Sequence, residues 1–138
     1  MEITIKNLPD VKTSDYLPSV ELIGKAQEIL SFSMGAMMQK YLLECGFLEF
    51  SFVEISGIYE NKGLDSDLIT NTLRLRKQYN QLEKYVVLED KGDGDYTLCN
   101  EQDEIFNFIP TCSDEPTSIK YNLLQYFEKR YRDVVAQK

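Results

Sequence analysis

The residues of this chain that could do chemistry are carboxylates, because its 138 residues include 23 Asp and Glu and no His. The absence of histidine removes Ser-His and Cys-His nucleophile pairs, His-ligated zinc and the usual general base near neutral pH. Adjacent acids such as Glu89-Asp90 and Asp103-Glu104 could form a glycosidase pair if two of them faced each other across a cleft. Because acids are so abundant in this chain, adjacent acids do not indicate a catalytic pair. A solvated acidic surface is the favoured interpretation.

The acidic stretch 89–95 (EDKGDGD) lacks the spacing of a calcium site or a dinucleotide site. An EF-hand loop counted from Asp90 needs an oxygen ligand at its third position, where Gly92 stands. Gly92 and Gly94 are not followed by a third glycine at Thr97, as a dinucleotide-binding turn requires. We therefore predict a plain hairpin turn here, with no metal and no cofactor.

The overall charge indicates the kind of partner. A net charge of -8 and an isoelectric point near 4.6 give the surface a negative field, which repels nucleic acid phosphates and anionic lipid and attracts basic protein surfaces. We predict a protein partner with a basic surface, and neither direct nucleic acid binding nor membrane binding. Solubility alone is an alternative explanation of such a charge.

Cysteine usage and hydropathy indicate the compartment. Cys45, Cys99 and Cys112 are widely spaced, which fits neither a disulfide framework nor a CxxC metal site, so we predict buried, reduced thiols. The first ten residues have no basic stretch followed by an apolar one, and nowhere do eighteen apolar residues run together. We therefore expect a cytoplasmic protein, neither secreted nor membrane-spanning.

Apolar residues at spacings of three and four predict four helices. Ser19 and Ser33 are suitable caps for the first two, and Gly46 ends the second. The predicted helices cover 19–30, 34–44, 64–79 with Asp65 or Ser66 as its N-cap, and a C-terminal stretch that Pro116 opens and that continues to Val134. The second helix carries Met34, Met37 and Met38, for which a core position is favoured over an adaptable binding surface.

Aromatic and β-branched stretches between these helices predict the strands. We predict one strand, bent or bulged, within 47–59, a hairpin formed by 85–88 and 96–99, and a further strand at 105–109. Helices and strands in this order predict an α+β fold, a single domain over residues 1–138 with helices packed against an antiparallel sheet.

Aromatic and acidic residues meet where the first predicted strand ends. Tyr59 and Glu60 follow a predicted sheet edge and border the loop 61–67 (NKGLDSD). Aromatic side chains with acids at a loop rim suit the anchoring of a basic partner. The residues predicted to line the partner surface are Glu49, Glu54, Tyr59, Glu60, Asp65 and Asp67.

The order and spacing of five segments resemble the SUKH superfamily, which includes bacterial toxin-immunity proteins and the yeast glucan-synthesis regulator domain. Those segments are 38–46 (MQKYLLECG), 50–59 (FSFVEISGIY), 70–74 (TNTLR), 85–100 (YVVLEDKGDGDYTLCN) and 118–131 (SIKYNLLQYFEKRY). The resemblance covers residues 19–135. The chain departs from the family before the second helix, where the family often has Leu-Pro and this chain has Phe-Ser-Met-Gly at 32–35.

The resemblance implies a SUKH-like domain without catalytic activity that binds and neutralises a cognate bacterial toxin by stoichiometric occlusion. Such toxins are commonly nucleases or otherwise directed at nucleic acid. One alternative is a regulatory or scaffolding module that binds a host protein, as in the glucan-synthesis regulator. Another is a carboxylate-dependent hydrolase, which predicts a buried acid with a raised pKa in a cleft.

Overall fold

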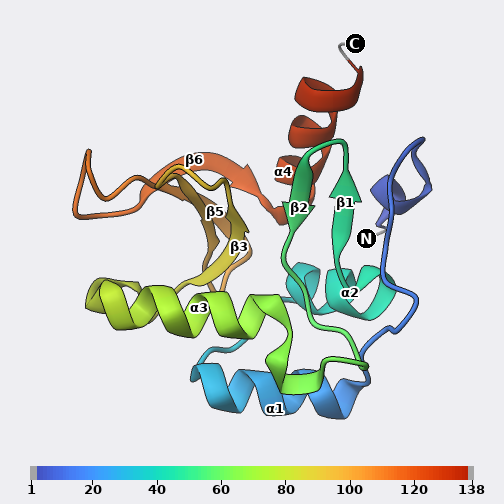
Figure 1. The fold of residues 1–138 in the computed structure, drawn as a ribbon, viewed down its shortest axis with the longest axis horizontal. Coiled ribbons are helices and arrows are strands. Elements are labelled where there is room, and N and C mark those ends of the chain that lie inside the picture. The colour runs from blue at the N-terminus through green and yellow to red at the C-terminus, as the bar shows by residue number, and fades with distance from the viewer. Residues whose placement is uncertain (1–2, 137–138) are drawn as a thin grey trace.

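The computed structural model describes residues 3–136, in which helices flank a four-stranded sheet and a separate two-stranded hairpin (Figure 1). The helices are α1 (Val20–Leu30), α2 (Ala36–Cys45), α3 (Asp67–Gln78) and α4 (Leu123–Tyr131). The strands are β1 (Leu48–Phe50), β2 (Val53–Ile55), β3 (Val86–Asp90), β4 (Tyr96–Cys99), β5 (Glu104–Phe108) and β6 (Thr117–Asn122). Short 3-10 helices occur at Thr4–Asn7, Gly63–Asp65 and Asn80–Leu82, and a π-helical segment, Arg132–Ala136, follows α4.

Strands β3 to β6 form an antiparallel meander in chain order, and β1 pairs with β2 in the separate hairpin. The backbone N–H of Ser56, just after β2, donates to the Leu88 carbonyl of β3 at 2.8 Å and so ties the hairpin to the sheet. In Figure 1, α3 lies between the sheet and α1, and the hairpin stands beside α4. The predicted α+β class with an antiparallel sheet and packed helices is confirmed.

Both faces of the sheet are buried at β3, which explains why this strand is a continuous apolar run rather than an alternating one. Val86 and Leu88 belong to the larger core, which also holds buried residues of α1, α2 and α4. Val87 points to the other face, into a smaller core with Leu75 of α3 and Phe108 of β5. The sheet is therefore a central layer with helices on both sides.

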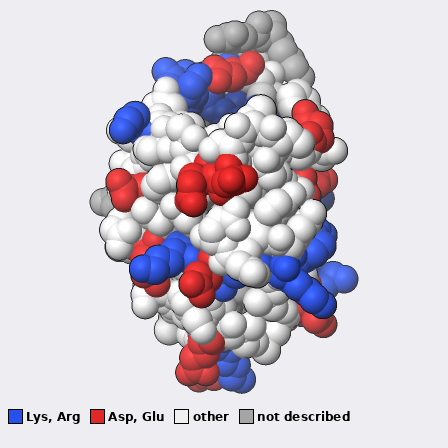
Figure 2. Space-filling model, turned by 90° about the vertical axis from the view of Figure 1, so that its left-hand side faces the viewer, with Lys and Arg blue, Asp and Glu red and all other residues white. Residues whose placement is uncertain are grey.

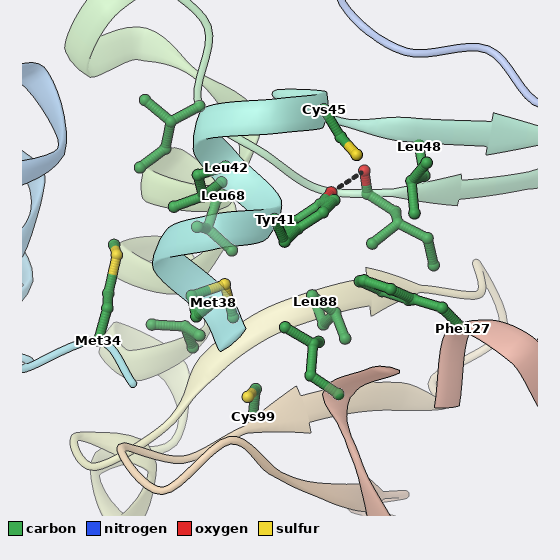
Figure 3. Packing of buried hydrophobic residues seen from close by; sticks show 14 of the residues in the cluster. Met34, Met38, Tyr41, Leu42, Cys45, Leu48, Leu68, Leu88, Cys99 and Phe127 are labelled. Carbon is green, nitrogen blue, oxygen red and sulfur yellow. Dashed lines mark hydrogen bonds between the residues drawn. The ribbon is translucent and has the colours of Figure 1, made fainter. Parts of the chain in front are cut away.

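The methionines of the second helix lie in the larger core, as the sequence predicts. Met34 and Met38 are buried, and Met37 packs against the same core while partly exposed. Figure 3 shows Met38 and Tyr41 on α2 pointing toward Leu88 and Phe127. The Tyr41 hydroxyl donates to the Ser56 carbonyl at 2.7 Å, so the polar tip of this fully buried ring is satisfied.

The start of α2 differs from the prediction, because Ser33 is not its cap. The helix begins at Ala36 with Gly35 at the N-cap position, and the carboxylate of Asp103 caps it from the loop between β4 and β5. The Asp103 oxygens accept from the N–H groups of Met37 and Met38, both at 3.0 Å. A Cβ atom at Gly35 would collide with this carboxylate. A side chain that is distant in sequence therefore replaces the local cap.

The predicted single strand within 47–59 is wrong, because the chain reverses in its middle to form β1 and β2. Phe50 pairs with Val53, so Ser51 and Phe52 form a two-residue turn with Ser51 at a φ of 54°. This turn lacks the Asn-Gly or Gly signal of such hairpins. Because the chain reverses over Ser51 and Phe52, both strands turn the same face inward. The core therefore contains Leu48, Phe50, Val53 and Ile55.

The C-terminal helix begins later than predicted, and Pro116 does not open it. Residues Thr117–Asn122 form β6, which pairs with β5 at the edge of the sheet. Asn122 then caps α4 in a capping box, accepting from the Gln125 N–H at 2.9 Å while the Gln125 amide oxygen accepts from the Asn122 N–H. The apolar spacing of three and four therefore begins at Ile119, before the first residue of α4, and does not mark where the helix starts.

The cysteines agree only partly with the prediction of buried thiols. All three are free, and Cys45 and Cys99 are buried, but Cys112 is exposed in the loop between β5 and β6. Burial raises the pKa of Cys45 to about 12, so this thiol stays protonated and packs as a small apolar group. In residues 3–136, no helix has the length and apolarity that crossing a membrane demands.

Candidate protein-binding surface

The loop between β2 and α3 meets the segment that leads into α1, and their contact positions most of the predicted surface residues. The N–H of Glu60 donates to the Tyr16 carbonyl at 2.8 Å. The Glu60 carboxylate in turn accepts from the N–H of Ser19, the N-cap of α1, at 3.1 Å. A negative charge at a helix N-terminus is favourable because of the helix dipole. Glu60 is exposed nonetheless, so part of its carboxylate stays available to a partner.

Beside this contact lies an open hollow of about 270 Å³ with aromatic walls. Tyr16, Phe47 and Tyr59 contribute the aromatic side chains, and Lys12, Asp15 and Asn61 contribute polar ones. The rings of Phe47 and Tyr59 meet edge to face, with centroids 5.5 Å apart and an interplanar angle of 88°. This contact holds the Tyr59 ring in place, whereas Tyr16 is 57% exposed. We call this feature the aromatic hollow.

Asp67 supports the loop from inside and does not lie on the exposed rim. Its carboxylate accepts from the Gly57 N–H at 2.9 Å and also interacts with the Tyr59 hydroxyl. Burial raises the pKa of Asp67, although these two hydrogen bonds oppose the shift. Burial likewise raises the pKa of Tyr59, with the Asp67 charge as the next cause. Asp67 therefore positions Gly57 and Tyr59.

Glu49 and Glu54 lie directly opposite each other on β1 and β2. Like charges in such a cross-strand pair are unfavourable. Glu54 is exposed, whereas Glu49 is half-buried and close enough to Tyr59 for its charge to help raise the tyrosine's pKa. Backbone hydrogen bonds between Glu49 and Lys12, at 2.8 and 2.9 Å, hold this strand against the N-terminal segment.

The structure therefore groups the predicted residues unequally. Tyr59, Glu60 and Asp65 lie on the loop 56–66, Glu49 lies near it, and Glu54 lies on the neighbouring strand. Sequence reasoning missed Tyr16 and Phe47, which complete the aromatic hollow. The available signal was the pair Tyr16-Leu17, two large apolar residues outside any helical or strand periodicity, and both are exposed.

Further exposed apolar side chains flank the same region. Val20, in the first turn of α1, is 72% exposed, and Leu64 of the adjoining 3-10 helix is 38% exposed. Apolar side chains surrounded by polar ones are the composition of a protein interface. The acids on this side, Asp15, Glu21, Glu60 and Asp65, are all exposed, and none of them forms an ion pair with Lys or Arg within residues 3–136.

A different face of the molecule shows what an ordinary surface of this protein looks like. Figure 2 shows acidic and basic side chains interspersed among uncharged ones, so the excess negative charge is not gathered into one patch there. Within the described part of the chain, no group of three or more carboxylate or thiol side chains is placed to hold a metal ion.

We expect Asp67→Asn to change how stability depends on pH. The folded-state pKa of Asp67 lies above its ordinary value of 3.8, so the folded state binds this proton more tightly than the unfolded state. Between pH 3.8 and that higher pKa, the contribution of Asp67 to stability is lost as pH rises. The amide of Asn can still accept from Gly57 but cannot ionise. The free energy of unfolding of the variant relative to wild type should therefore rise as the pH increases from 3.8 to that higher pKa.

Urea titrations across that pH range measure the difference directly. Asp65→Asn is the matched control, because Asp65 is exposed and lies two residues before Asp67. A wild-type and Asp67→Asn difference that is constant with pH, or that moves in the opposite direction, would contradict the assignment of a burial penalty to Asp67.

Comparison with known proteins places the chain in a family. Residues 1–131 match the family model SUKH_5, described as SMI1-KNR4 cell-wall. The chain is also similar to a protein of Aspergillus flavus named geranylgeranyl pyrophosphate synthase atmG, with 29% identity over 115 residues. That match covers 79% of this chain and 33% of the Aspergillus protein, so the chain spans about a third of that relative's length. Because the family model matches nearly the whole chain, this protein belongs to the SMI1-KNR4 family of the SUKH superfamily.

Proposed function

We propose that this protein acts by binding another protein with a basic surface, and that it carries no catalytic activity of its own. The observation that supports this most is the surface around the aromatic hollow, where exposed apolar side chains lie among acids that form no ion pair within residues 3–136. Interfaces of this kind gain affinity from the apolar anchors, and orientation and association rate from the charges. Family membership agrees with a protein-binding role, because the superfamily includes toxin-immunity proteins and a glucan-synthesis regulator domain.

Within this class, we propose that the partner is a cognate bacterial toxin and that the protein neutralises it by one-to-one occlusion. A toxin that acts on nucleic acid must present cations to the phosphate backbone. An acidic protein competes for that same surface and is steered toward it over distances near the Debye length. The same contact between acidic and basic surfaces would therefore give both the affinity for the toxin and the block of its access to nucleic acid. The site of action proposed for the pair is the cytoplasm.

A regulatory or scaffolding module is the second candidate, and the description of the matching family model, SMI1-KNR4 cell-wall, favours it. Such a module also binds a protein, so the two candidates share the same kind of surface. They differ in what happens when cells make the partner. Co-expression with an immunity protein restores growth of cells that produce the toxin, whereas co-expression with a regulatory module rescues no toxicity.

A carboxylate-dependent hydrolase is the third candidate, since Asp67 has the raised pKa that this hypothesis expects. However, its carboxylate accepts from the Gly57 N–H and interacts with the Tyr59 hydroxyl. A general acid or base needs its oxygen free to reach a substrate proton. We therefore assign Asp67 to support of the loop and propose that it has no catalytic role.

We expect the double variant Glu60→Lys with Asp65→Lys to weaken partner binding about tenfold or more and to reduce its dependence on salt. Both carboxylates are exposed, so reversal replaces attraction of a basic surface by repulsion. Titration calorimetry at about 0.05 M and about 0.5 M salt gives both quantities.

The matched control is Asp114→Lys with Glu115→Lys, which changes the net charge by the same amount. These two exposed acids lie in the loop between β5 and β6, which Figure 1 shows on the side of the molecule away from the hairpin. The control should bind as wild type does. Equal effects of the two double variants would show that total charge, and not this surface, governs binding.

A further inference from the structure

The aromatic hollow has the size and the lining residues of a binding pocket for one side chain. Its volume of about 270 Å³ suits a single long side chain rather than a segment of chain. Phe47 and Tyr59 are fixed by their edge-to-face contact and are half-buried. Tyr16 forms the third aromatic wall and is 57% exposed. A hollow with rigid aromatic walls and an exposed ring at its mouth gains contact area when an inserted group covers that ring.

The charges around this hollow favour a cation as the inserted group. Asp15 lines the hollow, and the Asp67 carboxylate reaches the Tyr59 hydroxyl. Glu49 also lies within electrostatic reach of Tyr59, and Glu60 is the next residue along the chain. The nearby positive charges come from Lys12, which lines the hollow, and from Lys62 in the loop. Among the residues that line the hollow, Lys12 and Asp15 balance each other, so the negative excess felt at Tyr59 comes from Asp67 and Glu49.

Among cationic side chains, the guanidinium of arginine fits these walls better than the ammonium of lysine. A guanidinium is planar, stacks on aromatic rings, and presents a fork of N–H donors to a carboxylate. Asp15, which carries a carboxylate, and Asn61, whose amide can act as a neutral acceptor, both line this hollow. An ammonium is more strongly hydrated and loses more when it is taken out of water.

We propose that the aromatic hollow receives an arginine side chain of the partner protein, held between aromatic rings and paired with Asp15. This assignment rests on the proposed function, since it names the anchor by which a basic partner engages the surface. It makes Tyr16 and Asp15 determinants of partner specificity. Lys12 opposes the inserted charge, so its removal strengthens the interaction.

The test is an NMR titration of the intact protein with a short capped peptide of glycines around one arginine, beside the same peptide with lysine or norleucine. We expect saturable shifts of Tyr16, Phe47 and Tyr59 signals with the arginine peptide, and binding about two- to fivefold weaker with lysine. Tyr16→Ala and Asp15→Asn should weaken arginine binding, and Lys12→Gln should strengthen it. Phe52→Ala is the matched control, because Phe52 is 75% exposed at the hairpin tip and does not line the hollow.

Equal shifts with all three peptides, or no shift of the hollow's residues with arginine, would overturn the arginine assignment. The proposed function has a separate readout in the Glu60→Lys, Asp65→Lys variant. If this variant loses the partner while the arginine peptide leaves the hollow unchanged, the protein binds a basic partner without an arginine in this hollow. If the peptide binds and this variant keeps full affinity for the partner, the arginine site stands and the loop acids do not govern partner binding.

Discussion

Replacing Arg130 with alanine is expected to lower the free energy of unfolding by about 3–5 kcal/mol, because it leaves the buried carboxylate of Glu89 without its cation. Glu89 is only 3% exposed. Arg130 Nη2 donates to Oε2 of this carboxylate at 2.8 Å, and Nε donates to Oε1 at 3.2 Å. The Tyr126 hydroxyl adds a bond to Oε1 at 2.6 Å. Burial and the Glu89 charge raise the pKa of Tyr126, so this hydroxyl remains a donor.

A bulge in β3 explains why a carboxylate is buried at this place. The pairing of β3 with β4 shifts register between Val87 and Glu89. Without that shift, Glu89 would point to the same face as Val87, into the smaller apolar core. The shift turns Glu89 to the face of α4, where Arg130 and Tyr126 lie. The bulge and the charged pair therefore depend on each other.

Urea unfolding of three variants separates loss of the pair from loss of a surface arginine. Arg132→Ala is the matched control, because Arg132 is exposed and lies two residues further along. Arg130→Lys should fall between wild type and Arg130→Ala, since lysine restores the charge without the two-point contact. An Arg130→Ala protein within about 1 kcal/mol of wild type would show that water reaches and stabilises Glu89.

Gly57→Ala is the second substitution with a large expected effect, a loss of about 3 kcal/mol in the free energy of unfolding. An added Cβ would collide with the carbonyl oxygen of Gly46 and would lie 2.5 Å from its carbon. This obstacle is backbone and cannot rotate aside. The same Gly46 carbonyl accepts from the Ile58 N–H at 3.1 Å, so relief of the collision breaks a hydrogen bond as well.

Gly57 also holds the proposed binding surface in place. Its N–H donates to Asp67, and its carbonyl accepts from the Leu68 N–H at 3.1 Å, which fixes the start of α3. We therefore expect Gly57→Ala to weaken partner binding even under conditions where the protein stays folded. Gly24→Ala is the control, because a Cβ there meets no atom within 4 Å and alanine stabilises a helix by about 0.5–1 kcal/mol. Thermal unfolding of both variants measures the contrast, and equal melting temperatures would contradict the packing of Gly57 against Gly46.

Local signals in the sequence were sufficient for much of the fold. Ser19 caps α1 by accepting from the Leu22 N–H at 3.1 Å, as its position before the apolar stripe predicts. The turn 91–95 joins β3 to β4, as its glycines predict. These features depend on residues that are neighbours in the chain.

Features set by distant contacts could not be predicted in the same way. Asp103 caps α2 from another loop, and nothing near Gly35 indicates it. Thr117–Asn122 has the apolar spacing of a helix, yet pairing with β5 makes it a strand. The capping box of Asn122 and Gln125 was a readable signal of the true helix start.

In the candidate surface, too, features set by neighbouring residues could be predicted, and features set by distant contacts could not. The sequence predicts Tyr59 and Glu60 for this surface because an aromatic residue and an acid follow a strand next to a loop. Tyr16 was missed because it is distant from the loop in sequence and meets it through tertiary contacts, among them the hydrogen bond between its carbonyl and the Glu60 N–H. Asp67 was placed on the rim because its type is acidic, whereas the fold turns it inward to Gly57.

Capture from a lysate of the source organism is the sharpest test that this protein binds a basic partner through its loop acids. The baits are the wild-type protein, the Glu60→Lys, Asp65→Lys variant and the Asp114→Lys, Glu115→Lys control, each at about 0.05 M and about 0.5 M salt. We expect wild type and control to retain one basic protein at near-equal stoichiometry at low salt. High salt and the Glu60→Lys, Asp65→Lys variant should release this protein. Capture that is the same with all three baits, or no captured protein from cells known to make the candidate toxin, would show that these acids do not bind a basic partner.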